Sequence, residues 1–417
     1  MLLAALALAG AGAVVAAEPN QGPLQVHGFA SQGFVLTSGN TNVNGSSSDK
    51  NGSFEYHELG VNGSWQPRSN LLLSGQLASV RAGQSVDEYL TIEYALVDYT
   101  PFQGSKGRAG MRAGKLKLPI GFYNDTRDVV FTRPGVLLPQ GVYLETSGAR
   151  AFGYFSSIGA SLYGDLYLGE HALYLEGAGY VRQNLGETAD IAILRRDASG
   201  DFKVDRGFTL RLMDDWDGGR ARAALSLASV QLSYEASNRV PSASNLFAQD
   251  GDLDFKQAVL SLQYNWPAFS LTAEYCWRTF TLDDLIPGPF SSAVDLDPSG
   301  AYVQGTYRFS PKWSSFLRYD EQIRDAHDRS GRRQEAESQQ ASAATGGLAP
   351  VQPRHYFFAR DWTVGTRYDL RSDLALWSEF HWVDGNAWVN PLDNPGFDRG
   401  GAERHWNLFT VMLGYRF

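Results

Sequence analysis

Charged residues stand at alternate positions within several apolar stretches of this chain. In the run 269–281, Glu274 and Arg278 fall on the opposite row from Tyr275 and Trp277. A period of two places such rows on opposite faces of a β-strand. A charge on a lipid-facing row costs about 2–4 kcal/mol at the membrane midplane, so we expect the charged rows to face water inside a closed sheet. The charges expected on this inner face are Glu58, Glu93, Arg112, Arg211, Glu274, Arg278, Arg308, Arg318, Asp320, Arg367, Asp369 and Glu379.

Residues 119–150 carry a second group of charges without clean alternation. Asp125, Arg127, Asp128 and Arg133 stand among apolar residues too numerous for a free outer loop. Irregular backbone at membrane depth is tolerated only where it is buried in protein or lines a water-filled cavity. We therefore expect this segment to fold inward and to bring its four charges to the narrowest point of the interior.

The inner wall supplies arginines that are expected to oppose these charges. Arg112, Arg318 and Arg367 are placed to face the two aspartates of the segment and to set a transverse field. Clusters of charge at a narrowing set ion preference. The alternative is that Asp125, Arg127 and Asp128 pair among themselves and only hold the segment.

Motifs for catalysis, cofactors or metals are absent from the sequence. It contains no G-x-S-x-G, H-E-x-x-H, C-x-x-C or P-loop pattern. Asp250, Asp252 and Asp254 are spaced as in calcium loops but lack the glycine and glutamate of that motif, so a solvated acidic loop is the preferred interpretation. The sequence predicts no enzyme, no cofactor and no metal site.

Bulk properties narrow the class further. A net charge of −9 argues against nucleic-acid binding, and the single Cys276 excludes an intramolecular disulfide. The mean hydropathy of −0.28 is that of a soluble protein, but barrel strands hide their membrane signal in alternation. The 10 Trp, 20 Tyr and 23 Phe suit aromatic belts at two membrane interfaces.

The alternation defines sixteen expected strands separated by turn signals. They span residues 26–37, 54–65, 71–81, 89–99, 108–118, 151–163, 172–183, 208–213, 221–236, 255–266, 269–281, 301–309, 313–324, 361–370, 374–383 and 405–417. Connections after even strands are mostly short and those after odd strands mostly long, which predicts periplasmic turns, outer loops and both termini in the periplasm. The hydrophilic run 325–353 is expected to be a mobile loop. The fold class is therefore all-β: a transmembrane, antiparallel, up-and-down barrel of sixteen strands, which leaves a water-filled channel.

The two ends of the chain indicate export and closure. Residues 1–17 are predicted to be a signal peptide, although no Lys or Arg precedes its apolar core, and the barrel is expected to occupy 18–417. The last strand alternates an apolar row ending in Phe417 with a mixed row.

Sixteen strands, an export signal, the terminal Phe417 and the insertion after the fifth strand together resemble Gram-negative porins. The resemblance implies that residues 119–150 form the constriction loop, and that the barrel-assembly machinery reads the Phe417 pattern. It also implies a bacterial outer-membrane location and a homotrimer, for which Gly28, Ala30, Gly177 and Gly179 offer small contact residues. The segment departs from the general-diffusion porins in lacking their Pro-Glu-Phe-Gly stretch.

The predicted function is passive diffusion of small hydrophilic solutes and ions through a barrel embedded in outer-membrane lipid. The nearest alternative is a channel of the same shape selective for an oxyanion or a carboxylate. An outer-membrane enzyme barrel would need a Ser/His constellation, and an export barrel would need a partner-binding extension.

Overall fold

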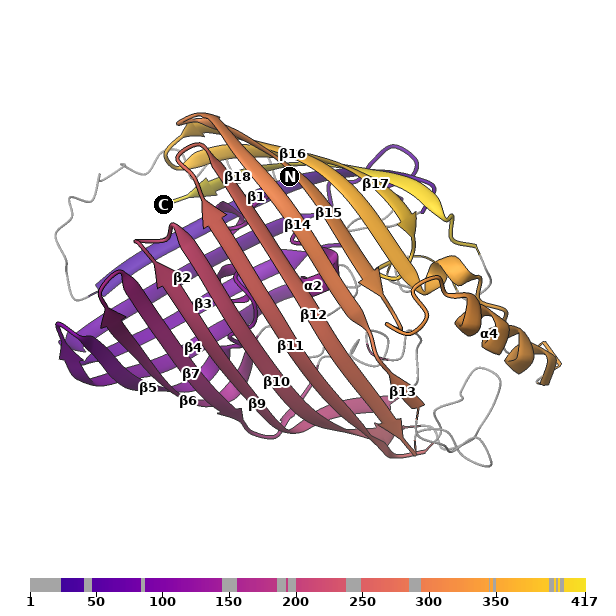
Figure 1. Cartoon of the computed structure of the whole chain (residues 1–417), viewed down its shortest axis with the longest axis horizontal. Coiled ribbons are helices and arrows are strands. Elements are labelled where there is room, and N and C mark those ends of the chain that lie inside the picture. Colours follow the sequence, from indigo (N-terminus) through magenta and orange to yellow (C-terminus); the bar gives the residue numbers. More distant parts are fainter. Residues whose placement is uncertain are drawn as a thin grey trace.

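One antiparallel sheet closes on itself to form a barrel (Figure 1). The structure, a computed structural model, describes residues 24–40, 47–83, 87–144, 156–185, 193, 200–237, 249–284, 294–344, 346–347, 350–389, 394, 397 and 401–417. Within these residues the sheet contains eighteen strands, of which β8 (Gln183–Asn184) and β13 (Val294–Leu296) are short pieces beside longer neighbours. The remaining sixteen strands close the barrel, so the predicted fold class is confirmed. They are β1 (Leu24–Ser38), β2 (His57–Arg68), β3 (Leu71–Arg81), β4 (Asp87–Gly104), β5 (Gly107–Lys117), β6 (Ser156–Leu168), β7 (His171–Tyr180), β9 (Gly200–Trp216), β10 (Ala221–Ala236), β11 (Gly251–Asn265), β12 (Phe269–Asp283), β14 (Ser299–Ser310), β15 (Trp313–Ile323), β16 (Phe358–Arg371), β17 (Leu374–Gly385) and β18 (His405–Arg416).

The seam between the first and last strands completes the barrel. β1 pairs with β18 in a register that opposes Phe29 to Arg416. Beyond it, Gly28 and Phe417 exchange two backbone hydrogen bonds of 3.1 and 3.0 Å. The Phe417 ring lies over Gly28, where a Cβ atom would collide with it. Gly28 therefore packs against the terminal residue of its own chain.

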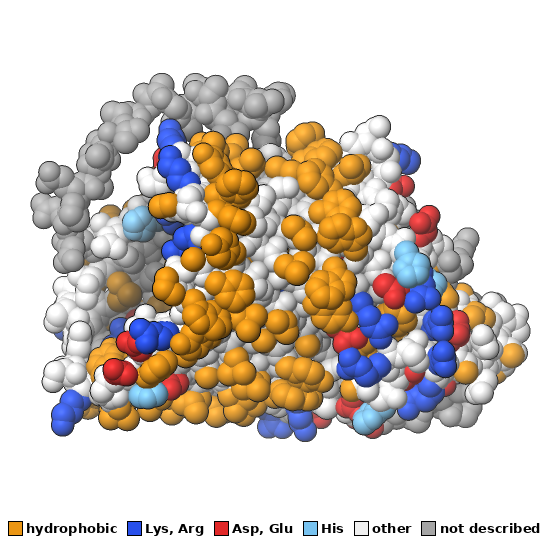
Figure 2. Space-filling model, turned by 45° about the horizontal axis from the view of Figure 1, so that its top comes forward, with side chains coloured by type: hydrophobic (Ala, Val, Ile, Leu, Met, Phe, Trp, Pro, Cys, Tyr) orange, Lys and Arg blue, Asp and Glu red, His pale blue; other side chains and the backbone are white. Residues whose placement is uncertain are grey.

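The two faces of the wall differ as the alternation predicts. On β18, Leu408 and Met412 point inward and are fully buried, whereas Leu413 on the other row is 44% exposed. Aromatic residues border the outer wall near both ends: Trp266 lies 4.4 Å from Tyr264 between ring centroids, and Tyr319 lies 4.9 Å from Trp362. Figure 2 shows hydrophobic side chains covering the wall and charged ones gathered toward its edges. Aromatic belts around an apolar band are the surface of a barrel that sits in lipid.

Most strand boundaries follow the sequence pattern. The predicted runs 71–81 and 221–236 coincide with β3 and β10. β9 is longer than the predicted run 208–213. Its first part was not recognised in the sequence because Phe202 and Val204 are buried inside while polar residues occupy the outer row. A register shift between Gln231 and Leu232 of the neighbouring strand also breaks the alternation there. The short turns all lie at one end of the barrel and the long connections at the other, as predicted.

The prediction of a mobile loop over 325–353 did not include a helix. The segment contains the helix α4 (Arg332–Ala344), which stands clear of the barrel (Figure 1). The Asp328 carboxylate caps it, accepting the backbone N–H groups of Arg332 at 3.1 Å and Gln334 at 3.0 Å. The helix buries none of its side chains, so its sequence lacks the apolar stripe by which helices are recognised. Among the residues that the structure describes, no helix has the length and apolarity to cross a membrane.

Candidate pore constriction

The connection after β5 folds into the barrel. Residues 118–144, its described part, are called the inserted segment here and contain η2 (Asn124–Thr126), η3 (Val130–Thr132) and α2 (Gln140–Tyr143). Residues 145–150 of the predicted loop lie outside the described residues. The Asn124 amide donates to the Leu118 carbonyl at 2.8 Å and turns the chain inward just after the strand. Three prolines, at positions 119, 134 and 139, further limit its conformations.

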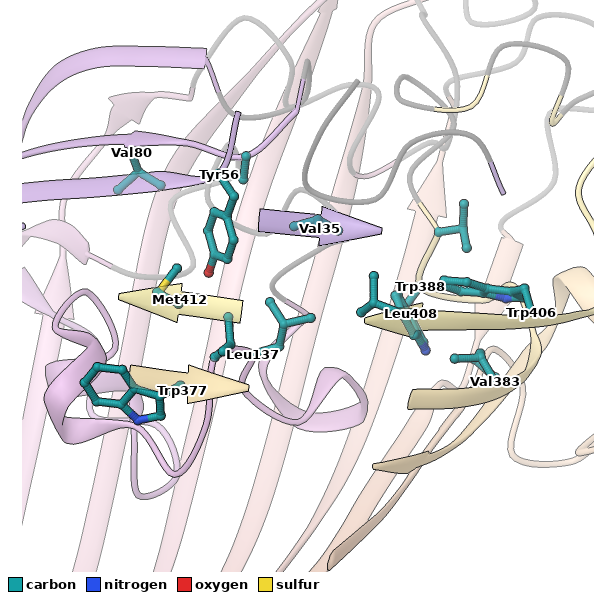
Figure 3. Packing of buried hydrophobic residues seen from close by; sticks show 14 of the residues in the cluster. Val35, Tyr56, Val80, Leu137, Trp377, Val383, Trp388, Trp406, Leu408 and Met412 are labelled. Atoms are coloured by element: carbon teal, nitrogen blue, oxygen red, sulfur yellow. The ribbon is translucent and has the colours of Figure 1, made fainter. Parts of the chain in front are cut away.

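One side of the inserted segment packs on the wall next to the seam. Val130, Phe131, Val136 and Leu137 join a buried cluster with inner-wall residues of β1, β3 and β16–β18. Figure 3 shows Leu137 beside Met412 and Trp377 of that wall. The Phe131 and Trp377 rings meet edge to face with centroids 5.0 Å apart. We call this group the seam cluster.

The other side packs on the opposite part of the wall. Ile120, Leu138, Val142 and Tyr143 belong to a second buried cluster with residues of β7, β9–β12 and β14. Because the seam cluster and this far cluster lie on different parts of the wall, the inserted segment crosses the interior. Its apolar side chains are kept dry on both sides, which is what their number in the sequence demanded.

Charged wall residues satisfy the backbone of the inserted segment. The Glu379 carboxylate accepts the N–H groups of Val136 at 2.7 Å and Leu137 at 3.1 Å. The Arg318 guanidinium donates to the Leu137 carbonyl at 3.2 Å. A buried backbone group without a partner costs free energy comparable to a lost hydrogen bond. These inward charges therefore hold the segment and do not line an aqueous path.

The helix α2 is held in the same way and lies unusually close to the wall. Arg278 donates to the carbonyls of Gly141 at 2.9 Å and Val142 at 2.6 Å, and Asp320 accepts the Gly141 N–H at 3.0 Å. Gly300 of β14 faces this turn, and a Cβ there would lie 2.8 Å from the Gly141 Cα and closer still to its carbonyl. Only glycine at 300 lets the two backbones approach so closely.

The four predicted segment charges do not share one role. Arg127 is 2% exposed and donates to Asn124 Oδ1 at 3.1 Å and to the Tyr143 carbonyl at 3.4 Å. Asp128 and Arg133 are equally buried and reach different strands, Asp128 binding Lys117 at 2.5 Å and Arg133 binding Glu58 at 2.9 Å. Asp125 alone among the four keeps substantial solvent contact.

Asp125 pairs with a wall arginine other than those expected. Its carboxylate lies 2.6 Å from the Arg211 guanidinium of β9, and its side chain remains 38% exposed. The expected partners bind elsewhere: Arg112 contacts Asp98 at 2.9 Å and Glu176 at 3.2 Å, while Arg367 contacts Asp369 at 2.9 Å. Asp125 and Asp128 thus each bind a wall cation, Arg211 and Lys117 respectively. Arg211 was visible in the alternation, but sequence gives no register between distant strands and could not say which cation meets which aspartate.

Partly exposed ion pairs gather on one stretch of wall, from β4 to β10. Besides Asp125–Arg211 they include Arg112 with Asp98, and Arg222, which lies 3.4 Å from Asp215. The Arg112 guanidinium carbon also lies 4.1 Å from the Tyr163 ring centroid. The Arg112 and Arg222 side chains are 25% and 32% exposed. We take the place where these partly exposed pairs meet the inserted segment, at Asp125 and Arg211, as the candidate constriction.

Comparison of the whole fold with solved structures agrees with this architecture. The chain is similar to the outer membrane channel DcaP of Acinetobacter baumannii, with a TM-score of 0.54 and 12% identity over 94% of this chain and 97% of that one. This is the porin fold. OmpT of Vibrio cholerae matches with a TM-score of 0.52 and 12% identity over 94% and 97% of the two chains. The anion-selective porin from Comamonas acidovorans matches with 0.50 and 13% over 94% and 98%.

Sequence comparison adds nothing to the porin fold. No family model matches the chain, and no curated protein matches it. At 12–13% identity, the similarity to these solved structures establishes the fold, which is an outer-membrane architecture. The solute must be argued from the chain's own residues.

Proposed function

We propose that this chain is an outer-membrane porin through which small hydrophilic solutes and ions diffuse passively. The observation that carries the proposal is the group of partly exposed ion pairs around Asp125 and Arg211, in a barrel crossed by the inserted segment. A barrel of sixteen strands is wide enough to leave an aqueous channel, and its apolar outer wall fits lipid. The similar solved structures include proteins described as an outer membrane channel and a porin, which supports the same function.

The charges at the candidate constriction are nearly balanced. Each exposed arginine there has a carboxylate within ion-pair distance, as Arg211 has Asp125 and Arg222 has Asp215. Opposite charges at close range cancel at a distance, so the constriction is expected to pass both cations and anions. Polar groups on a narrow, wet surface favour hydrophilic solutes over apolar ones.

Export, assembly and association complete the proposal. Residues 1–17, which lie outside the described residues, act as the signal peptide, and residues 18–417 form the membrane domain. The barrel-assembly machinery reads the Phe417 pattern, and the barrel works as a homotrimer in the bacterial outer membrane. The porin-fold structures that are similar include a trimer form of OmpT, which supports the trimer.

Reconstitution tests the proposal directly. Purified barrel in planar bilayers should give stepwise ohmic conductance in KCl, and liposomes containing it should swell in sugars at rates that fall with sugar size. The same protein unfolded by heat should do neither. Folded barrel that inserts but neither conducts nor admits sugars would contradict the proposal, and recovery of the protein outside the outer-membrane fraction would contradict the location.

A further inference from the structure

Positive charge gathers on the inner wall at the end of the barrel that carries the short turns. Arg308 of β14 and Arg367 of β16 lie in one row across the sheet, each opposite Ser314 of β15. Arg416 lies near the end of β18, on the inward row that includes Met412. Arg308 and Arg416 are both exposed to solvent.

Contacts with the inserted segment place this charge inside the lumen. The Arg416 guanidinium carbon lies 4.7 Å from the centroid of the Phe131 ring, and that of Arg367 lies 5.6 Å from the same ring. Phe131 belongs to the part of the segment that packs in the seam cluster. The two arginines therefore stand between the short-turn mouth and the inserted segment, on the route to the constriction.

Most carboxylates at this mouth are already neutralised. On the inner wall Asp369 pairs with Arg367, Asp215 with Arg222 and Asp165 with Arg108. On the turns Asp217 pairs with Arg220 and Asp373 with Arg371. Two carboxylates here lack a lysine or arginine partner: Glu170 accepts the indole N–H of Trp216 at 3.2 Å, and Asp214 contacts the His171 ring at 2.8 Å.

The cations at this mouth outnumber their partners. Within the described residues, which include every short turn, five have no carboxylate in ion-pair distance: Arg68, Lys106, Arg308, Lys312 and Arg416. Arg416 donates only to the Ser372 carbonyl, at 3.0 Å. These five unpaired cations exceed the two carboxylates without a cationic partner, Glu170 and Asp214, so this mouth is positive in a chain whose net charge is −9.

We propose that the short-turn mouth is a vestibule that collects small anions, with Arg308 and Arg416 as its lumenal charges. The inference rests on the proposed porin function and names the solute class that this mouth favours: small carboxylates, phosphate and halides. A concave, low-dielectric wall bearing one sign of charge focuses its field and raises the local concentration of counter-ions. The planar guanidinium group binds oxyanions through two parallel N–H donors, so oxyanions should be held longer than chloride.

Because the positive mouth has no counterpart at the constriction, the channel should conduct unequally in its two directions. Screening sets the size of the effect: the Debye length grows from about 3 Å at 1 M salt to about 30 Å at 0.01 M. The current at opposite voltages of equal size should therefore be nearly the same in concentrated KCl and clearly different in dilute KCl.

The experiment compares three proteins as single channels in planar bilayers. They are the natural chain, the double variant Arg308→Gln with Arg416→Gln, and a control, Lys50→Gln with Arg332→Gln. The control removes the same charge from two exposed positions at the opposite end of the barrel. Current–voltage curves are recorded in dilute and concentrated KCl, and phosphate is then added to each side in turn.

The natural chain and the control should rectify in dilute KCl, prefer chloride over potassium in a salt gradient, and lose current when phosphate is added to one side but not the other. The double variant should lose the asymmetry and most of the chloride preference. Symmetric curves for the natural chain in dilute salt, or a double variant that behaves like it, would overturn the vestibule while leaving the porin function standing. Absence of any conductance in folded, inserted protein would instead overturn the porin function.

Discussion

Replacing Gly300 by alanine tests whether the inserted segment is docked as described. The added Cβ would lie 2.8 Å from the Gly141 Cα, and closer to the Gly141 carbonyl, whereas real Cβ contacts need at least 3.0 Å. The helix α2 must therefore move off β14, and it would pull its backbone away from Arg278 and Asp320. Hydrogen bonds to charged groups contribute about 1.5–3 kcal/mol each, so weakening two of them should cost roughly 3–6 kcal/mol before relaxation.

The direction of the movement gives a functional readout. In a ring of sixteen strands the side facing β14 is the neighbourhood of β4, which belongs to the wall that bears the candidate constriction. Moving α2 off β14 should therefore narrow the candidate constriction and lower the single-channel conductance, while urea unfolding followed by tryptophan fluorescence should show the lost stability. Gly75→Ala is the matched control, since its Cβ meets nothing nearer than 3.4 Å. A Gly300→Ala barrel with natural stability and conductance would refute the docking, and a higher conductance would refute the position of the path.

The remaining predictions concern three aspartates, Asp125, Asp128 and Asp328, and the terminal Phe417. Asp125→Asn leaves the Arg211 charge uncompensated at the candidate constriction, so the potassium-to-chloride permeability ratio should fall; an unchanged ratio would make the pair a scaffold. Asp128→Asn should leave that ratio unchanged but cost about 1–3 kcal/mol of unfolding free energy, because its buried contact with Lys117 loses a charge. Burial raises the pKa of Asp328, but the backbone N–H groups that its carboxylate accepts outweigh this and hold the pKa below the ordinary 3.8. The charged cap therefore stabilises α4 at pH values above 3.8, and this stabilisation is lost as the pH falls through the lowered pKa. Amide exchange over 332–344 should therefore accelerate in acid, and Asp328→Ala should accelerate it at neutral pH, by about 1 kcal/mol of local stability; pH-independent exchange would dismiss the cap. Deleting Phe417 should lower the yield of heat-modifiable barrel, and normal assembly would show that the terminal pattern is incidental.

The architecture was open to sequence reasoning because it rests on local rules. A strand such as β10 can be recognised by its alternation between two turns, and both of its boundaries were predicted to the residue. The helix α4 was missed because a helix that packs on nothing carries no apolar periodicity. The start of β9 was missed because its outward-facing residues are polar and its inward-facing residues are apolar. This is the reverse of the alternation from which the strands were predicted.

The candidate site was predicted only as a set of residue types. The sequence located the inserted segment and its charges, since so many apolar residues between charges needed a dry place. It could not separate Asp125, which meets water, from Arg127 and Asp128, which are buried, because burial depends on contacts between residues far apart in the chain. The roles of Glu379 and Arg318 were likewise hidden, since a charge that holds a backbone and a charge that lines a pore occupy the same inward row.

The path of the inserted segment has a mechanical consequence. It is fastened to β2 through Arg133 and Glu58, and to β12, several strands around the ring, through the hydrogen bonds of Arg278 to α2. An empty cylinder squeezed by lateral lipid pressure flattens into an ellipse, but a strut fixed at facing points resists both flattening and spreading. The inserted segment therefore acts as a cross-brace between β2 and β12. The circular cross-section of this barrel depends on that segment as well as on the strands of its wall.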